Sequence, residues 1–307
     1  MEPEHLPHLL AAIETGWTLG KQAKPLFAQK WEEVWDRPLV QLRQELHLVP
    51  AAPKASEGIR FSPPSGTATE LNIRKAAIAD IPFLARIQYE ASLPPLNHCF
   101  WEDMLQGTGT GSLQFIEAML RAEASNWGNV ADYWVLEAQG KPVAAAAGYT
   151  PKLEDYCPLR LAGLDQIAQD LNWSKAVATT FRDRYLHLWQ GNLQPSFLIP
   201  VADWIIENVA VLPEARGRGL AKVLLRALLE EGRSRQHSHA GIMVVNGNDV
   251  AYHTYQALGF KPYQTFHAQY FLDLFHLEFP GVTKLGLRLN ETAESLAAVK
   301  SDPTSGT

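Results

Sequence analysis

Two arginines alternate with two glycines at residues 216–219, between a strand-like apolar run and an amphipathic helical pattern. Gly217 and Gly219 carry no Cβ, so successive backbone N–H groups of this turn can close on an anion. The anion would then lie at the N-terminus of the following helix, where unpaired N–H groups and the helix dipole favour negative charge. Arg216 and Arg218 can add charge-assisted hydrogen bonds. The spacing therefore predicts a pyrophosphate site, although a plain strand-to-helix turn would use the same glycines.

A second pattern follows the next strand-like run, at residues 240–245, and its layout is Asn-x-x-Ala-x-x-x-Tyr-x-x-x-Gly-Phe. It is filled by Asn248, Ala251, Tyr255, Gly259 and Phe260. A side-chain amide at the start suits a helix cap, and the final Gly-Phe suits a helix end that is anchored by a buried ring. Both patterns lie in one strand-helix-strand-helix segment. Their occurrence together in this order argues against a coincidence.

Together the two patterns resemble the GNAT superfamily of acyl-coenzyme A-dependent N-acetyltransferases. The first family signature, Arg/Gln-x-x-Gly-x-Gly/Ala, is matched here by Arg216, Gly219 and Ala221. Other phosphate-binding patterns fit less well, because Lys222 stands where a dinucleotide fingerprint needs its third glycine. The resemblance covers about residues 71–289. It implies an α/β (α+β) fold with a mixed, mostly antiparallel, twisted sheet flanked by helices.

The resemblance also implies the reaction and the residues that hold the co-substrate. An acetyl group would pass from acetyl-CoA directly to a primary amine in a ternary complex, with no metal. Backbone groups of the strand at residues 204–211 would pair with the pantetheine amides and stabilise the oxyanion. The expected coenzyme-binding set is Val209, Ala210, Val211, Arg216, Gly217, Arg218, Gly219, Leu220, Ala221, Asn248 and Tyr255.

Acid–base chemistry needs further groups, because an alkylammonium with a pKa near ~10 must lose a proton before it attacks. Glu207 is the first candidate base, since it lies on the strand nearest the expected thioester, and Asp203 is the second. Simple alternation along the strand puts Asp203, Glu207, Val209 and Val211 on one face. Tyr255 holds the family position of the acid that protonates the departing thiolate. Glu207 as a salt-bridged surface group and Tyr255 as an ordinary packed tyrosine are the competing interpretations.

Hydrophobic periodicity predicts the elements that must position these groups. A helix begins near Asp80, with Pro82 in its first turn, and others cover residues 113–120, 161–171 and 175–188, with further helices after residues 219 and 247. The expected strands are 71–76, 132–138, 143–149, 204–211, 240–245, 263–275 and 282–289.

The chain divides into segments of different composition. Residues 1–49 predict a helical N-terminal extension, 50–70 a Pro- and Ala-rich linker, 71–289 the acetyltransferase domain and 290–307 a flexible tail. A helical insertion at 151–202 precedes the coenzyme-binding strand and separates it from the strand before it. We expect this insertion either to form a wall or lid of the acceptor pocket or to be a helical hairpin with its own core.

Composition narrows the partners. The formal charge of −6 argues against nucleic-acid binding, and a hydrophobic fraction of 46% suits a globular core. Cys99 and Cys157 are expected as buried reduced thiols, and no signal peptide or membrane span is evident, so a cytoplasmic location is expected. The acceptor would be a small-molecule amine or a protein amine. The sequence is also compatible with a homodimer. The alternative function is a catalytically weak acetyl-CoA-binding regulatory module that acts through a protein partner.

Overall fold

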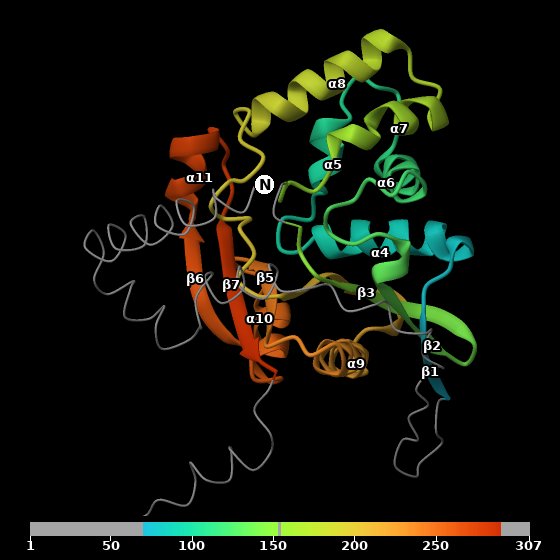
Figure 1. The fold of residues 1–307 in the computed structure, drawn as a ribbon, viewed down its shortest axis with the longest axis vertical. Helices are drawn as coiled ribbons and strands as arrows, with labels where there is room; N and C mark the ends of the chain where they lie inside the picture. The colour runs from blue at the N-terminus through green and yellow to red at the C-terminus, as the bar shows by residue number, and fades with distance from the viewer. Residues whose placement is uncertain (1–69, 153–154, 290–307) are drawn as a thin grey trace, which may run out of the picture.

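One twisted sheet organises the chain in this computed structural model, which describes residues 70–152 and 155–289 (Figure 1). Seven strands of these residues lie in the order β1-β2-β3-β4-β5-β7-β6. Neighbouring strands are antiparallel except β4 and β5, which are parallel. The mixed, mostly antiparallel sheet expected from the sequence is therefore confirmed. The strands are β1 (Leu71–Lys75), β2 (Tyr133–Ala138), β3 (Lys141–Tyr149), β4 (Trp204–Val211), β5 (His239–Val245), β6 (Lys261–His267) and β7 (Gly281–Arg288).

Helices cover both faces of this sheet. One group, which includes α4 and α6, lies on the face that also carries the inserted segment, and α9 packs across β2 to β5 on the opposite face (Figure 1). Each face has its own buried apolar cluster. The helices are α4 (Ile81–Ser92), α5 (Phe100–Met104), α6 (Ser112–Arg121), α7 (Leu164–Asp170), α8 (Lys175–Leu188), α9 (Leu220–Ser234), α10 (Asp249–Gln256) and α11 (Ala268–Phe275), with short 3₁₀ turns at Ile78–Asp80, Val130–Asp132, Leu161–Gly163 and Pro213–Ala215.

The sequence-based strand at residues 263–275 is wrong in its second half. The strand ends at His267, and residues 268–275 form α11. Phe271 and Phe275 stand one helical turn apart and both contact Phe197 of the inserted segment, with ring centroids 4.8 and 5.7 Å apart. The local sequence of an aromatic-rich run is compatible with a strand or a helix. Here the run is helical, and the helix packs its rings against Phe197.

The chain start and end lie outside the described residues. The expected extension at 1–49, the tail at 290–307 and all of the linker except its last residue fall there. Within the described part, Cys99 and Cys157 are buried free thiols, as expected. In that same part, no helix combines the length and the apolar character that crossing a bilayer requires.

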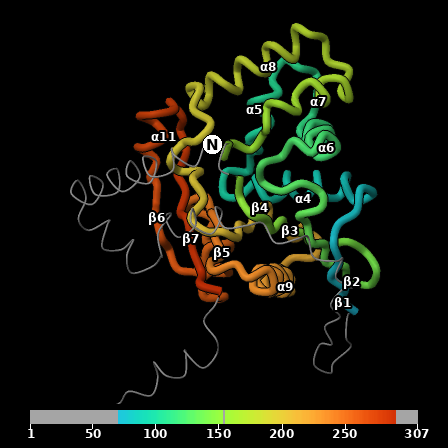
Figure 2. Tube along the Cα trace, in the orientation of Figure 1, coloured from blue at the N-terminus to red at the C-terminus, as the bar shows by residue number. Residues whose placement is uncertain are grey.

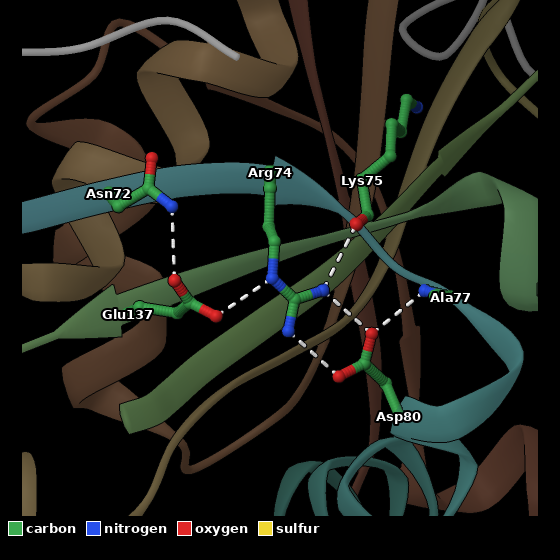
Figure 3. Close-up of polar contacts among 6 residues, drawn as sticks. All are labelled: Asn72, Arg74, Lys75, Ala77, Asp80 and Glu137. Atoms are coloured by element: carbon green, nitrogen blue, oxygen red, sulfur yellow. Dashed lines mark hydrogen bonds and ion pairs between the residues drawn. The ribbon is translucent and has the colours of Figure 1, made fainter. Parts of the chain in front are cut away.

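A polar cluster fixes where α4 leaves the sheet (Figure 3). The Arg74 guanidinium on β1 donates to both carboxylate oxygens of Asp80, at 2.7 and 2.9 Å, and to Glu137 on β2, at 2.7 Å. Asp80 also accepts from the backbone N–H of Ala77 at 2.7 Å. Asp80 is the N-cap of α4, with proline in the first turn, so the expected helix start is confirmed.

Trp204, the first residue of β4, fastens α9 to the sheet. Its fully buried indole donates from Nε1 to the backbone carbonyl of Leu228 on α9, at 3.0 Å. A Cβ on Gly148 of β3 would lie 2.6 Å from the indole, and one on Gly232 of α9 would lie 2.8 Å from it. Two glycines thus make room for one large ring at the start of the strand that carries Glu207.

We expect Gly148→Ala to lower the free energy of unfolding by about 1–3 kcal/mol, because the added methyl overpacks this contact. Gly232→Ala should cost less, since alanine gains about 1 kcal/mol of helix propensity inside α9. Urea denaturation followed by tryptophan fluorescence measures both variants. Equal stability of Gly148→Ala and the parent protein would contradict the tight packing at Trp204.

Candidate active site

Pairing between β4 and β5 stops part-way along the two strands. Trp204 pairs with Ala240 and Ile206 with Ile242, which is the last pair, although β4 continues to Val211 and β5 to Val245. The β5-facing edge of β4 therefore has no strand partner from Glu207 onward in the described chain. Such an edge offers backbone donors and acceptors to an extended ligand.

A β-bulge at Asn208 re-aims the second half of β4. Glu207 is paired with Ala147 and Ala210 with Ala145, so β4 has one residue more than β3 at this point. Asn208 takes a left-handed conformation with φ of 54°, and its side-chain amide donates to the carbonyl of Trp127 at 3.0 Å. Asparagine tolerates this conformation better than most residues. The amide contact holds the bulge in place.

The bulge overturns the expected alternation along β4. Val209 and Val211 pack with the apolar cluster under α9, together with Trp204 and Ile206. Ala210 packs in the cluster on the opposite face. The expectation that Glu207, Val209 and Val211 share a face is wrong, because the extra residue shifts the side-chain order by one.

A cavity opens on the face that carries the inserted segment, and Glu207 lines it. The empty space inside it is about 520 Å³, including its open mouth. Its floor comes from strands β3, β4, β5 and β7, and its roof from the two ends of the inserted segment, at residues 151–152, 155–156 and 197–201. Figure 2 follows the segment after α8 past α11 and β7 to the start of β4. α7 packs on α6, and α8 packs on α5 and α7, so these helices stand behind the roof.

Removal from water raises the pKa of Glu207 to about 8, while a hydrogen bond from the backbone N–H of Asn208 acts in the opposite direction. At neutral pH this carboxyl is mostly protonated, and it loses its proton as the pH rises through about 8. A carboxyl whose pKa is close to the working pH is suited to general base catalysis.

Tyr255 of α10 approaches Glu207 from the other face of the sheet. Its ring is 7% exposed and belongs to the apolar cluster under α9, and it does not line the cavity. Burial raises the pKa of Tyr255 well above its usual range, and the charge of Glu207 adds to the rise. The phenol therefore keeps its proton at neutral pH. The two sequence-predicted acid–base residues therefore belong to opposite faces of the sheet, and what links them is the effect of the Glu207 charge on the pKa of the phenol.

Asp203, the second candidate base, points elsewhere. Its carboxylate accepts hydrogen bonds from the backbone N–H groups of Ser238 and His239, both at 2.8 Å, and it lies 3.5 Å from His237. It does not line the cavity. These bonds, with desolvation opposing them, lower the pKa of Asp203. The contacts favour a structural role, in which Asp203 fixes the start of β5.

The turn before α9 has the geometry of an anion site. Gly217 and Gly219 have φ of 76° and 72°, and a Cβ on either would meet no atom within 4 Å. Leu220 and Ala221 form the first turn of α9, and no side chain caps that helix. N–H groups at a helix start have no partner within the helix and bind anions readily.

Arg216 is held beside this turn. Its Nε donates to the carbonyl of Val211 at 3.0 Å, and its guanidinium forms an ion pair with Glu90 of α4 at 2.8 Å. Arg218, the other predicted arginine, is exposed. On α10, Asn248 is the N-cap and accepts from the backbone N–H of Ala251 at 3.3 Å, so the expected cap is confirmed.

Sequence reasoning missed two residues of the site, Asn208 and Lys284. An asparagine inside a β-branched strand is a signal of a bulge, and this signal was available. Lys284 of β7 is 4% exposed and lines the cavity, yet a lone lysine in a strand is usually a surface residue. Among the described residues, no group of three or more His, Cys, Asp or Glu side chains is placed to hold a metal ion.

Residues 98–260, just over half of the chain, match the sequence model of the acetyltransferase (GNAT) family. Streptothricin acetyltransferase of Streptomyces lavendulae is 38% identical over 55 residues, which are 18% of this chain and 29% of that protein. The chain thus spans under a third of this relative in the match. An N-acetyltransferase of Staphylococcus aureus Mu50 aligns with a TM-score of 0.44 and 18% identity over 70% of this chain and 99% of that one. The yncA protein of Salmonella typhimurium, solved with its cofactor acetyl-CoA, aligns with a TM-score of 0.41 and 16% identity over 73% of this chain and 96% of that one.

Proposed function

The chain belongs to the acetyltransferase (GNAT) family, and from this premise we propose that it transfers an acetyl group from acetyl-CoA to a primary amine. One observation carries the proposal: strand pairing between β4 and β5 ends at Ile206, immediately before Glu207. The break leaves a free strand edge between the cavity on one face and Tyr255 on the other. Two reactants can therefore approach the same point from opposite sides.

The residues of this chain fit a coenzyme of that kind. The open turn at Gly217 and Gly219 would hold the pyrophosphate on the N-terminus of α9, beside Arg216 and Arg218. The unpaired edge of β4, from Val209 to Val211, would pair with the pantetheine amides. Bound acetyl-CoA supplies a thioester, which is the acyl donor.

Glu207 would remove a proton from the acceptor ammonium in the cavity, and the freed nitrogen would attack the thioester carbonyl. A backbone N–H of β4 after the bulge would stabilise the negative charge that develops on the acetyl oxygen. As the C–S bond breaks, Tyr255 would donate its phenolic proton to the sulfur. The attacking nitrogen, which still carries two hydrogens, would lose one of them to solvent as the intermediate collapses to the amide. Glu207 would then return its proton to solvent and Tyr255 would regain one, so that each turnover releases amide, thiol and one net proton.

The experiment that tests the proposal combines calorimetric titration with acetyl-CoA and an assay of thiol release with a panel of amines. Binding together with amine-dependent thiol release supports the proposed transfer. Binding without release from any amine would favour the regulatory module instead. No binding of acetyl-CoA would overturn both.

Arg216→Ala should weaken acetyl-CoA binding by about 10- to 100-fold, as expected for one charge-assisted hydrogen bond to phosphate. Calorimetry at fixed ionic strength measures this change. Glu90→Gln is the matched control, because it releases Arg216 from its ion pair while the arginine stays in place. It should leave the affinity equal or tighter. Unchanged affinity of Arg216→Ala would remove this side chain from the coenzyme site.

A further inference from the structure

Lys284 of β7 brings a buried amine into the same cavity as Glu207. Its Nζ donates to two backbone carbonyls of the roof, Ser196 at 3.0 Å and Ile199 at 2.8 Å. An ammonium has three N–H donors, so these carbonyls leave one for another partner. The Phe266 ring lies 5.2 Å from Nζ, and no carboxylate of the described residues forms an ion pair with it.

A buried ammonium with no anionic partner is costly. Desolvation lowers the pKa of Lys284 to about 7. An anion placed in the cavity would stabilise the charged form, and the pairing would be strong because water is largely excluded.

Register puts Lys284 and Glu207 at opposite sides of the cavity floor. Lys284 is the direct partner of Met243 on β5, and Met243 follows Ile242, the last residue of β5 that pairs with β4. Glu207 stands in the same position on β4, directly after Ile206. Two regular strand spacings amount to roughly 10 Å. Because β4 and β5 no longer pair beyond Ile206, the strands of Glu207 and Lys284 are at least this far apart, with Met243 between them.

The cavity has a mostly apolar lining. Rings of Trp127, Tyr149, Tyr156 and Phe197 line it, together with aliphatic side chains such as Leu198. The other charged lining residues are Asp155 and Lys152. Asp155 accepts from the backbone N–H of Cys157 at 2.9 Å.

We propose that the acceptor is an amino-carboxylic acid with an apolar or aromatic body, whose carboxylate pairs with Lys284 while its amine faces Glu207. This inference rests on the proposed acetyl transfer and names its substrate class. A diamine fits less well, because its second ammonium would meet the Lys284 ammonium in a low-dielectric site. Lys284 is then a specificity-determining residue, and the same amine holds the roof through Ser196 and Ile199.

Matched acceptor pairs test the proposal, and each pair differs by a carboxylate. Suitable pairs are phenylalanine with phenethylamine and 4-aminobutanoate with butylamine, with 1,4-diaminobutane as the dication. We expect kcat/KM of the carboxylate member to exceed that of its partner by about tenfold or more in at least one pair. Preference for the plain amine or the diamine throughout would overturn the proposal.

Two substitutions separate the charge of Lys284 from its hydrogen bonds to the roof. Lys284→Gln keeps a donor for the roof carbonyls but has no charge, and Lys284→Met has neither. Both should reduce the carboxylate preference to under about threefold, whereas Lys261→Gln, a surface lysine on neighbouring β6, should keep it. The opposite result is an equal fall of kcat/KM for both members of a pair in Lys284→Met, with recovery of both values in Lys284→Gln. Lys284 would then be only a structural anchor.

A binding measurement tests the same point without turnover. Phenylalanine and 4-aminobutanoate are titrated calorimetrically, with and without coenzyme A, into the parent protein and Lys284→Gln. We expect the substitution to weaken binding at least about tenfold, and equal affinity would contradict the pairing. Absence of acetyl transfer to any amine would overturn the proposed function, and this titration would still decide on Lys284.

Discussion

Glu207→Gln is expected to lower kcat/KM for amine acetylation by about 10²–10³-fold near neutral pH, because the cavity loses the group that removes the ammonium proton. Glutamine keeps the size of the side chain and cannot accept that proton. Acetyl-CoA affinity should change little, since Glu207 lines the acceptor cavity and not the turn before α9. Steady-state thiol release, together with calorimetry, measures both quantities.

The pH profile gives the same prediction a sharper form. A base with a pKa of about 8 is active when it is deprotonated, so its contribution rises about tenfold per pH unit below 8 and levels off above it. The acceptor amine also titrates, but its ionisation is common to both enzymes. Dividing the parent profile by that of Glu207→Gln at each pH therefore isolates Glu207. A ratio that does not change between pH 6 and 9 would rule out Glu207 as the base.

Two controls keep this loss of activity distinct from unfolding. The folded pKa of Glu207 lies above its unfolded value, so the unfolded chain holds fewer protons between those values and stability falls as pH rises through them. Glu207→Gln should thus be at least as stable as the parent at pH 8. Asp203→Asn should show the reverse pattern, with near-parental kcat and a lower Tm, because it weakens the bonds to Ser238 and His239.

Tyr255→Phe is expected to lower kcat by about 10²-fold, because the departing sulfur would lose its proton donor. The ring stays in the apolar cluster, so folding and acetyl-CoA affinity should be close to those of the parent protein. Burial holds the phenol protonated throughout the pH range of the assay. Stopped-flow measurement of a single turnover separates the chemical step from product release.

Tyr252→Phe provides the matched control for the loss of a hydroxyl. Tyr252 lies on the same helix and packs against the same cluster, and it stands outside the family pattern. Its removal should leave kcat near the parental value. Equal effects of the two substitutions, or an unchanged kcat in Tyr255→Phe, would exclude Tyr255 as the acid.

Local pattern was sufficient for most of the fold. Strand β4 and helix α8 have the bounds expected from the sequence, and β5 and α10 differ by a residue or two. Their periodicity is strong and their ends carry turn or capping residues. The segment at 268–275 failed, because its apolar residues fit either period and its contact with Phe197 comes from a distant part of the chain.

The site shows the same division between local and long-range information. The turn at Gly217 and Gly219 and the cap at Asn248 depend on nearby residues, and sequence reasoning anticipated their conformations. Asn208 is a local signal of a bulge, but the face exchange after Glu207 is fixed only by the register between β4 and β3, which involves a distant part of the chain. The burial of Lys284 in the cavity could not be predicted, because it depends on the inserted segment, which returns over β7 and covers the side chain.

The roof of the cavity is attached largely through main-chain atoms. Trp127 donates its indole N–H to the carbonyl of Tyr156, and Lys284 donates to the carbonyls of Ser196 and Ile199. A carbonyl is present whatever side chain its residue carries, so an exposed roof residue such as Ile199 can be replaced while these attachments persist. Acceptor preference can thus diverge between descendants of this chain without disturbing the coenzyme half of the site. For enzyme engineering, a saturation library should begin at residues 151–152, 155–156 and 198–201.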